Sequence, residues 1–305
     1  MKDSYATPNA FRAALKDHLR AHARPHGPWP LADLQRQFGY DRLLARLYLH
    51  GSGWVVKGAT ALLAREIAVR HTIDLDIYRA SSRTEAEEDL RSAAAADLGD
   101  WFRFELAAGA PISEGQSGVR LGVLARIGTI EWARFHVDLV ASTVRMTGTP
   151  EDVPPLTPVS IPGLDRPGYR AYPLVDHVAD KTCAVLERHG PDQRASTRFK
   201  DLVDLVTLAR HARVDAAEQC RAVRSESARR ALELPATFDV PDRALWQVGF
   251  AAEARRAVLP MSRTLDEALA VVKPFLDPVL AGVAAGSWRA DLAAWSPPPL
   301  MREPT

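Results

Sequence analysis

The chain has 305 residues, of which 47% are apolar and 25% charged, and its 39 basic and 38 acidic side chains leave a net charge of +1. This length supports a large core in two lobes, and the balanced charge argues against a surface that binds polyanions over its whole extent. Only two cysteines are present, which excludes a disulfide framework. Without a leader-like start or an apolar run of roughly 20 residues, the sequence predicts a soluble, cytoplasmic protein with no membrane partner.

Apolar residues at helical spacing predict helices over 8–23 and 31–48, which form a helical lead-in within residues 1–50. The β-rich run GWVV follows and ends at Lys57 and Gly58, and a further helix is expected over 59–70. The next stretch, TIDLDIY, alternates with period 2. Its predicted strand has Ile73, Leu75 and Ile77 on one face and Asp74 and Asp76 on the other.

A helix over 84–98 and three strands, FRFELA, VRLGVLARI and TIEWARFHVDLVA, are expected next. Alternation in the last strand places Trp132, Arg134, His136 and Asp138 on one face. Seven prolines between Gly148 and Pro173 argue against a central strand or a long helix there. The sequence therefore predicts a bilobed α+β fold with an N-terminal mixed-sheet lobe (1–150), a proline-rich crossing (151–173), a C-terminal helical lobe (174–294) and a disordered tail (295–305).

The two aspartates of the TIDLDIY strand are the first candidates for a functional site. On one strand face their side chains lie within about 7 Å of each other, and two such carboxylates repel unless a proton, a basic group or a divalent cation compensates them. Magnesium fits when phosphate oxygens supply its remaining ligands. Asp138, at the end of a neighbouring strand, would complete a two-metal arrangement for phosphoryl or nucleotidyl transfer. Taken alone, the Asp-Leu-Asp pattern is more simply explained by a solvated edge strand with two surface charges, and it is the neighbouring residues at the preceding turn that favour a metal site.

Gly58 lies between the preceding strand and the helix, with Lys57 before it and Thr60 two residues after it. A residue without Cβ lets a phosphate approach the backbone, while the threonine adds a hydroxyl and the lysine a positive charge. The alternative is a plain tight turn with a capping threonine.

Two predicted helices of the second lobe carry further candidates. Lys181 lies on the flank of the first helix, and Asp201 and Asp204 share a flank of the second at i and i+3. An ordinary helical salt bridge from Lys200 to Asp204 is the competing explanation for these aspartates. The basic loop between the helices, from Arg188 to Lys200, is either a local phosphate-binding rim or a solvated loop.

Four segments in order, VVKGATALL, RHTIDLDI, ADK and RFKDLVDL, resemble the AbiEii/AbiGii group of nucleotidyltransferase toxins. That group includes the mycobacterial MenT toxins and belongs to the DNA polymerase beta-like superfamily. The resemblance spans residues 31 to about 212. It implies a mixed sheet with flanking helices that holds metal and nucleoside triphosphate, followed by a helical lobe.

The resemblance also implies roles for individual residues. The magnesium-binding pair corresponds to Asp74 and Asp76, and the third strand carboxylate to Asp138. The functional lysine and aspartate of the helical lobe correspond to Lys181 and to Asp204, with Asp201 as the other choice for the aspartate.

At the nucleotide-binding turn this chain has Gly58-Ala59-Thr60 where relatives have Gly-Gly-Thr. Thr72 stands where relatives commonly have serine before the aspartate pair, and a hydroxyl so near the metal is a possible site of inactivating phosphorylation.

The implied activity is transfer of a nucleoside monophosphate from a nucleoside triphosphate, with Mg²⁺ or Mn²⁺, to the 3′ acceptor end of tRNA. Such a transfer blocks aminoacylation and growth, and the implied partner is a cognate antitoxin encoded nearby. Two alternatives stay open at this stage: a nucleotidyltransferase that modifies a protein or a small-molecule hydroxyl, and a catalytically silent module that binds nucleotide or RNA.

Overall fold

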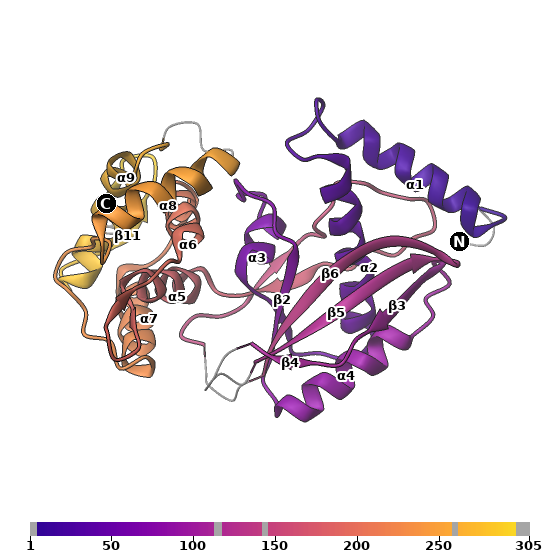
Figure 1. The fold of residues 1–305 in the computed structure, drawn as a ribbon, viewed down its shortest axis with the longest axis horizontal. Coiled ribbons are helices and arrows are strands. Elements are labelled where there is room, and N and C mark those ends of the chain that lie inside the picture. The colour runs from indigo at the N-terminus through magenta and orange to yellow at the C-terminus, as the bar shows by residue number, and fades with distance from the viewer. Residues whose placement is uncertain (1–4, 113–117, 142–145, 258–261, 297–305) are drawn as a thin grey trace, which may run out of the picture. The chain divides into compact units, whose positions relative to one another are not determined.

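The computed structural model describes residues 5–112, 118–141, 146–257 and 262–296, which form two compact units. Unit 1 comprises 1–66, 71–144 and 150–172, and unit 2 comprises 67–70, 145–149 and 173–305. A mixed sheet with helices characterises unit 1, and helices dominate unit 2 (Figure 1). This agrees with the predicted α+β class. No helix in the described ranges is long and apolar enough to cross a membrane.

Unit 1 is built on a sheet that, among the residues described, runs in the order β3-β5-β6-β2-β1-β8-β7, with β4 paired to β5. Its helices are α1 (Pro8–His22), α2 (Leu31–His50), α3 (Gly58–Ala64) and α4 (Arg83–Ala95). Its strands are β1 (Trp54–Val56), β2 (Asp74–Arg79), β3 (Phe102–Leu106), β4 (Ala110–Pro111), β5 (Gly118–Ile127), β6 (Ile130–Ala141), β7 (Glu151–Val153) and β8 (Tyr169–Ala171). The pairs β2–β6 and β1–β8 are parallel, and the others are antiparallel.

The two faces of this sheet differ in polarity because successive side chains alternate. Helices α2 and α4 contact each other and β6, and they cover the face that carries buried residues such as Leu121, Val137 and Leu139. The opposite face carries Arg120, His136 and Asp138, which are exposed or half-buried. Polar groups that need solvent or a ligand therefore gather on one side of the sheet.

Unit 2 contains α5 (Leu174–Leu186), α6 (Phe199–His211), α7 (Ala216–Arg229), α8 (Arg243–Arg256) and α9 (Leu265–Leu280). Two small hairpins accompany them, β9 (Arg188–His189) with β10 (Arg194–Ala195), and β11 (Ser287–Arg289) with β12 (Ala294–Ser296). Helix starts follow local chemistry, since Asp215, Asp242 and Thr264 accept backbone hydrogen bonds as N-caps of α7, α8 and α9.

Several sequence expectations need correction. The helix expected to run to residue 70 ends at Ala64, because Glu66 takes a positive φ of 58° and the next four residues belong to unit 2. The proline-rich segment was expected to contain no central strand, yet β8 lies between β1 and β7. Its prolines stay outside the two three-residue strands, so the ladder keeps its N–H donors.

For two apolar residues, the exposure to solvent differs from the prediction. Ile73 precedes β2 and is 58% exposed, although Leu75 and Ile77 are buried as expected. Trp132 is buried in contact with Phe102, since a bulge at Ala125/Arg126 shifts the β5–β6 register and removes Trp132 from the polar face. Of the tail expected to be disordered, residues 295 and 296 belong to β12, and 297–305 lie outside the described residues.

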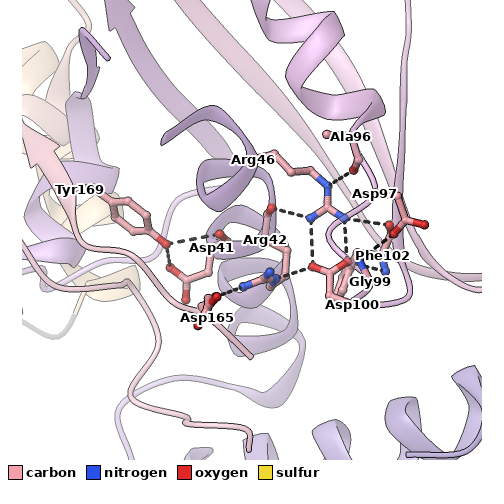
Figure 2. A network of polar contacts seen from close by, with 10 residues as sticks. All are labelled: Asp41, Arg42, Arg46, Ala96, Asp97, Gly99, Asp100, Phe102, Asp165 and Tyr169. Carbon is pink, nitrogen blue, oxygen red and sulfur yellow. Dashed lines mark hydrogen bonds and ion pairs between the residues drawn. The ribbon is translucent and has the colours of Figure 1, made fainter. Parts of the chain in front are cut away.

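A buried charge network fixes α2 within unit 1 (Figure 2). Arg46 donates to both carboxylate oxygens of Asp100, at 2.7 and 3.0 Å, and Arg42 Nε donates to the same carboxylate at 2.7 Å. Asp41, the residue before Arg42 in the chain, accepts a hydrogen bond from the hydroxyl of Tyr169 at 2.7 Å. Burial alone would raise the pKa of Asp100, but the two guanidinium groups outweigh it and lower that pKa. Asp100 therefore stays ionised and compensates two buried arginines.

Replacement of Asp100 by alanine should destabilise the protein by about 3–5 kcal/mol, because it leaves two buried guanidinium groups without their counter-ion. Asp97→Ala is the matched control, since Asp97 is exposed in the same loop and accepts only the backbone N–H of Gly99. Urea unfolding followed by circular dichroism measures both free energies. Equal effects of the two substitutions would contradict this account of the network.

Candidate functional site

The register of β2 against β6 brings the three strand carboxylates of the sequence analysis together. Asp76 pairs with Asp138, and Asp74 pairs with His136, in parallel register. Asp74 and Asp76 therefore share the polar face with Asp138. We refer to Asp74, Asp76 and Asp138 as the acidic row.

Asp74 is the member of this row with an unsatisfied atom. Its Oδ1 is buried and accepts no hydrogen bond, and His136 Nδ1 lies 3.4 Å from it. Its Oδ2 lies 3.7 Å from an amino group of Arg120. A buried carboxylate oxygen without a donor is poorly stabilised, so this position favours binding of a cation.

Asp76 lies against the turn that begins α3. Gly58 has a φ of +55°, and a Cβ added there would come within 2.1 Å of Asp76 Oδ2. The backbone N–H of Lys57 donates to the carbonyl oxygen of Asp76 at 2.8 Å. Glycine is therefore required at position 58 both by its backbone conformation and by the Asp76 carboxylate, which fills the space expected to admit a phosphate.

Thr60 and Thr72 fix the start of β2 through their hydroxyls. Thr60 Oγ1 donates to the carbonyl of Asp74 at 3.2 Å, and Thr60 is fully buried. Thr72 Oγ1 donates to the same carbonyl at 3.1 Å and accepts the backbone N–H of Asp74 at 3.2 Å. Thr60, predicted at the nucleotide-binding turn, and Thr72, predicted near the metal, thus position the aspartate strand from two sides.

Lys57 is the cation nearest to this turn along the chain. Its Nζ lies 4.0 Å from the ring centroid of Tyr172 and 5.9 Å from that of Tyr78. Aromatic faces attract an ammonium group and hold it in place. The rings of Tyr78 and Tyr172 therefore hold the ammonium group of Lys57 in place within unit 1.

A groove of about 700 Å³ lies on the polar face of the sheet. It is lined by residues from β3, β5 and β6 together with Arg36 and Ile73, and it reaches His136, which neighbours Asp74. Gly122, which pairs with His136 across β5 and β6, contributes no side chain to this lining. The acidic row therefore has an adjoining surface that is large enough for part of a substrate.

The second set of predicted residues meets in unit 2. Lys181 Nζ lies 2.9 Å from Asp201 Oδ1 and 2.6 Å from Asp204 Oδ2. Arg70 binds Asp204 through two hydrogen bonds, at 2.8 and 2.6 Å. Asp204 is 1% exposed, so the residue that the sequence could not distinguish from Asp201 is the centre of this cluster. Its partners are Lys181 and Arg70, and the competing explanation had paired it with Lys200.

Charge compensation sets the pKa values of this cluster. Burial lowers the pKa of Lys181, but Asp201 and Asp204 outweigh burial and the net shift is upward. Burial raises the pKa of Asp204, but Lys181 and Arg70 reverse that effect and hold it well below its usual range. Lys181 and Asp204 are therefore both charged near neutral pH.

The sequence analysis missed two residues of these sites, Arg70 and Arg120. Arg120 donates through Nε to Asp138 Oδ1 at 2.7 Å and through Nη2 to Asp138 Oδ2 at 2.6 Å. No local pattern identifies these arginines, because each meets its aspartate from another element. The sequence offers one indirect clue to these arginines, because a cluster of aspartates needs a positively charged partner.

The carboxylates of Asp74 and Asp76 are hard oxygen donors of the kind that Mg²⁺ prefers, and the unsatisfied Asp74 Oδ1 fits such an ion. Within the described residues, no group of three or more His, Cys, Asp or Glu side chains is arranged to hold a metal. A cation at Asp74 and Asp76 would take its other ligands from substrate and water.

Comparison with known proteins identifies the family. A family model described as the nucleotidyl transferase AbiEii toxin of type IV toxin–antitoxin systems matches residues 42–271. The chain belongs to this family. As an AbiEii family member it is a nucleotidyltransferase of the toxin class, which confirms the predicted resemblance. No curated protein matches the chain.

Two solved structures are similar to this AbiEii family member. MenT4, a nucleotidyltransferase toxin from Mycobacterium tuberculosis, is 17% identical, with a TM-score of 0.50 over 86% of this chain and 99% of MenT4. JHP933 from Helicobacter pylori is 15% identical, with a TM-score of 0.44 over 81% of this chain and 93% of that one. The MenT4 comparison confirms the predicted fold class.

Asp204→Asn should destabilise the protein by about 3–5 kcal/mol, because it leaves the buried Lys181 and the half-buried Arg70 without their shared counter-ion. Asp201→Asn is the matched control, since it leaves Asp204 to compensate Lys181, and we expect a clearly smaller loss. Chemical unfolding at pH 7 measures both free energies. A larger loss for Asp201→Asn would contradict the assignment of Asp204 as the centre.

The contribution of this cluster should depend on pH in a defined direction. A carboxyl group with a lowered folded pKa stabilises the fold above its ordinary value of 3.8 and loses that effect as pH falls through the folded value. Lys181, with a raised pKa, stabilises the fold below 10.5 and loses that effect at higher pH. The stability difference between parent and Asp204→Asn should therefore be constant from about pH 5 to 9 and shrink below about pH 4. Unfolding curves across this range test the prediction, which a constant difference down to pH 2 would contradict.

Proposed function

We propose that the protein transfers a nucleoside monophosphate from a nucleoside triphosphate to the 3′ acceptor end of tRNA, with release of pyrophosphate. The acceptor hydroxyl would attack the α-phosphorus, the bond from that phosphorus to the bridging oxygen would break, and the hydroxyl proton would pass to solvent. A nucleotide added to the 3′ end would block aminoacylation of the tRNA, and this would explain how the toxin inhibits growth. The observation that carries the proposal is the acidic row on the open face of the sheet.

Asp74 and Asp76 are the residues we assign to Mg²⁺ or Mn²⁺. A bound divalent cation would supply electrostatic stabilisation of the charge that develops on the phosphates. Gly58 and Thr60 position the two carboxylates from the side of α3, and Thr72 positions Asp74 from the start of β2. Lys57 is assigned to the triphosphate, whose charge a single ammonium group partly neutralises.

Lys181, Asp201 and Asp204 are assigned a positioning role. Lys181 is 6% exposed and its Nζ contacts both aspartates. The cluster joins α5, α6 and the segment that carries Arg70, four residues before Asp74 in the chain. Loss of any of its charges would therefore disturb the segment that leads into β2.

A cluster of basic side chains on the surface of unit 2 supports RNA as the acceptor. Arg188, Arg194 and Arg198 are exposed on and beside the β9–β10 hairpin of unit 2, and Lys200 is exposed at the start of α6. Basic side chains of this kind bind backbone phosphates and orient a nucleic acid without reading its sequence. The net charge of +1 shows that any such contact is local. A cytoplasmic location and a cognate antitoxin encoded nearby complete the proposal.

Incubation with total tRNA, Mg²⁺ and each α-labelled nucleoside triphosphate in turn tests the function. We expect label on RNA from one or more nucleotides with the parent protein. Asp76→Asn, which keeps the shape of the side chain and removes its charge, should lower the rate by about 100-fold or more. Asp152→Ala is the control, since Asp152 is 90% exposed on β7 and should leave the rate unchanged.

Parallel reactions with a protein extract and with an aminoglycoside separate the possible acceptors. Label on protein or on the aminoglycoside without label on RNA would contradict the tRNA assignment and keep the nucleotidyl transfer. No label on any acceptor with any of the four nucleotides would contradict the proposed activity as a whole.

A further inference from the structure

Arg120 belongs to the same cross-strand row as two of the aspartates. It pairs with Asp138 in the antiparallel register of β5 and β6, and Asp138 pairs with Asp76 in the parallel register of β6 and β2. An arginine and two aspartates thus stand side by side on three consecutive strands of one sheet. Their arrangement follows from backbone pairing, so it does not depend on a flexible loop.

The guanidinium of Arg120 uses both oxygens of Asp138. The contacts of 2.7 and 2.6 Å are the parallel pair of hydrogen bonds that a planar guanidinium makes with a carboxylate. The same Nη2 lies 3.7 Å from Asp74 Oδ2, so the charge of Arg120 acts on two members of the acidic row. Hydrogen bonding to Asp138 is the main cause that raises the pKa of Arg120, which remains charged at every working pH.

A second divalent ion on Asp138 would meet this charge directly. Two metals in a transferase site are held by carboxylates they share, and here both oxygens of the third carboxylate already accept from a cation. A divalent ion on Asp138 would have to displace the two hydrogen bonds that Arg120 donates to it, whereas Arg120 Nη2 lies 3.7 Å from Asp74 Oδ2, beyond hydrogen-bond distance. Asp74, by contrast, keeps its buried Oδ1 without a hydrogen bond.

We propose that Arg120 takes the place of a second metal ion, so that the site binds one divalent cation, at Asp74 and Asp76, and offers the Arg120 guanidinium as its second positive charge. This inference rests on the proposed function. It assigns Asp138 to hold Arg120 in place, which differs from the two-metal arrangement expected from the sequence. Arg120 is 44% exposed at its side chain, so it is accessible to a polyanionic substrate such as a triphosphate.

Counting bound Mn²⁺ tests this assignment without any turnover. Manganese alone is titrated into the full-length protein, and the free ion is followed by its electron paramagnetic resonance signal. We expect one ion per chain for the parent protein and two for Arg120→Ala, in which Asp138 becomes available as a ligand. Arg120→Lys, which keeps the charge, should bind one, and the double variant Arg120→Ala/Asp138→Asn should return from two to one.

Arg126→Ala is the matched control. Arg126 lies on the same strand and makes a cross-strand ion pair with Glu105 at 2.7 Å, and its removal should leave the count at one. Thermal melting checks that each variant is folded. If Arg120→Ala has a clearly lower melting temperature, Arg120→Gln takes its place, because glutamine keeps more of the side chain without its charge. We expect two bound ions for that variant as well.

Two ions on the parent protein, or one ion on a folded Arg120→Ala, would overturn the inference, as would a parent protein that binds none. These outcomes are separate from those of the tRNA experiment. A parent protein that binds one ion and labels no RNA contradicts the acceptor assignment alone. A parent protein that labels RNA and binds two ions contradicts the role of Arg120 alone.

Discussion

The parallel pairing of β2 with β6 is the constraint on which the candidate site depends. Its register places Asp76 beside Asp138 and leaves Asp74 on the same face, so that three like charges share a small area. Such a row is stable only with compensating positive charge. Arg120 supplies one cation from β5, and the unsatisfied oxygen of Asp74 marks the position where another charge is needed. The pairing of β2 with β6 therefore decides where the candidate site lies in unit 1.

Each unit contains a buried charge cluster that fixes its elements. In unit 1, Asp100 compensates Arg42 and Arg46 and attaches α2 to the loop before β3. In unit 2, Asp204 compensates Lys181 and Arg70 and attaches α6 to α5 and to the segment before β2. Removal of one partner from such a cluster leaves an uncompensated charge in the interior, which is far more destabilising than loss of a surface pair. Each cluster therefore joins chain segments that are far apart in the sequence.

Local periodicity was sufficient to predict the aspartate strand and its polar face. The alternation of TIDLDIY and of the last part of β6 is visible in the sequence, so the positions of Asp74, Asp76 and Asp138 on strands could be predicted. The amphipathic pattern of the two helices placed Lys181 and Asp204 on helix flanks, but their burial is known only from the structure. Family motifs then gave the activity class, which the family match confirms.

What the sequence could not provide was the partner of each charge. Arg120 reaches Asp138 through strand register, and Arg70 reaches Asp204 across 134 residues of chain, so neither pairing leaves a local pattern. The bulge at Trp132 in β6, which removes this side chain from the polar face, is equally invisible to a strict two-residue period. The contact of Asp76 with Gly58 also depends on tertiary packing, although the glycine itself stood out.

Anomalous diffraction from crystals grown with Mn²⁺ and a non-hydrolysable nucleoside triphosphate analogue would locate the cation and the nucleotide that we propose at the acidic row. We expect one strong anomalous peak within bonding distance of the Asp74 and Asp76 carboxylates, with the analogue's phosphates beside it. Density for the analogue elsewhere, or a manganese peak away from both aspartates, would contradict it.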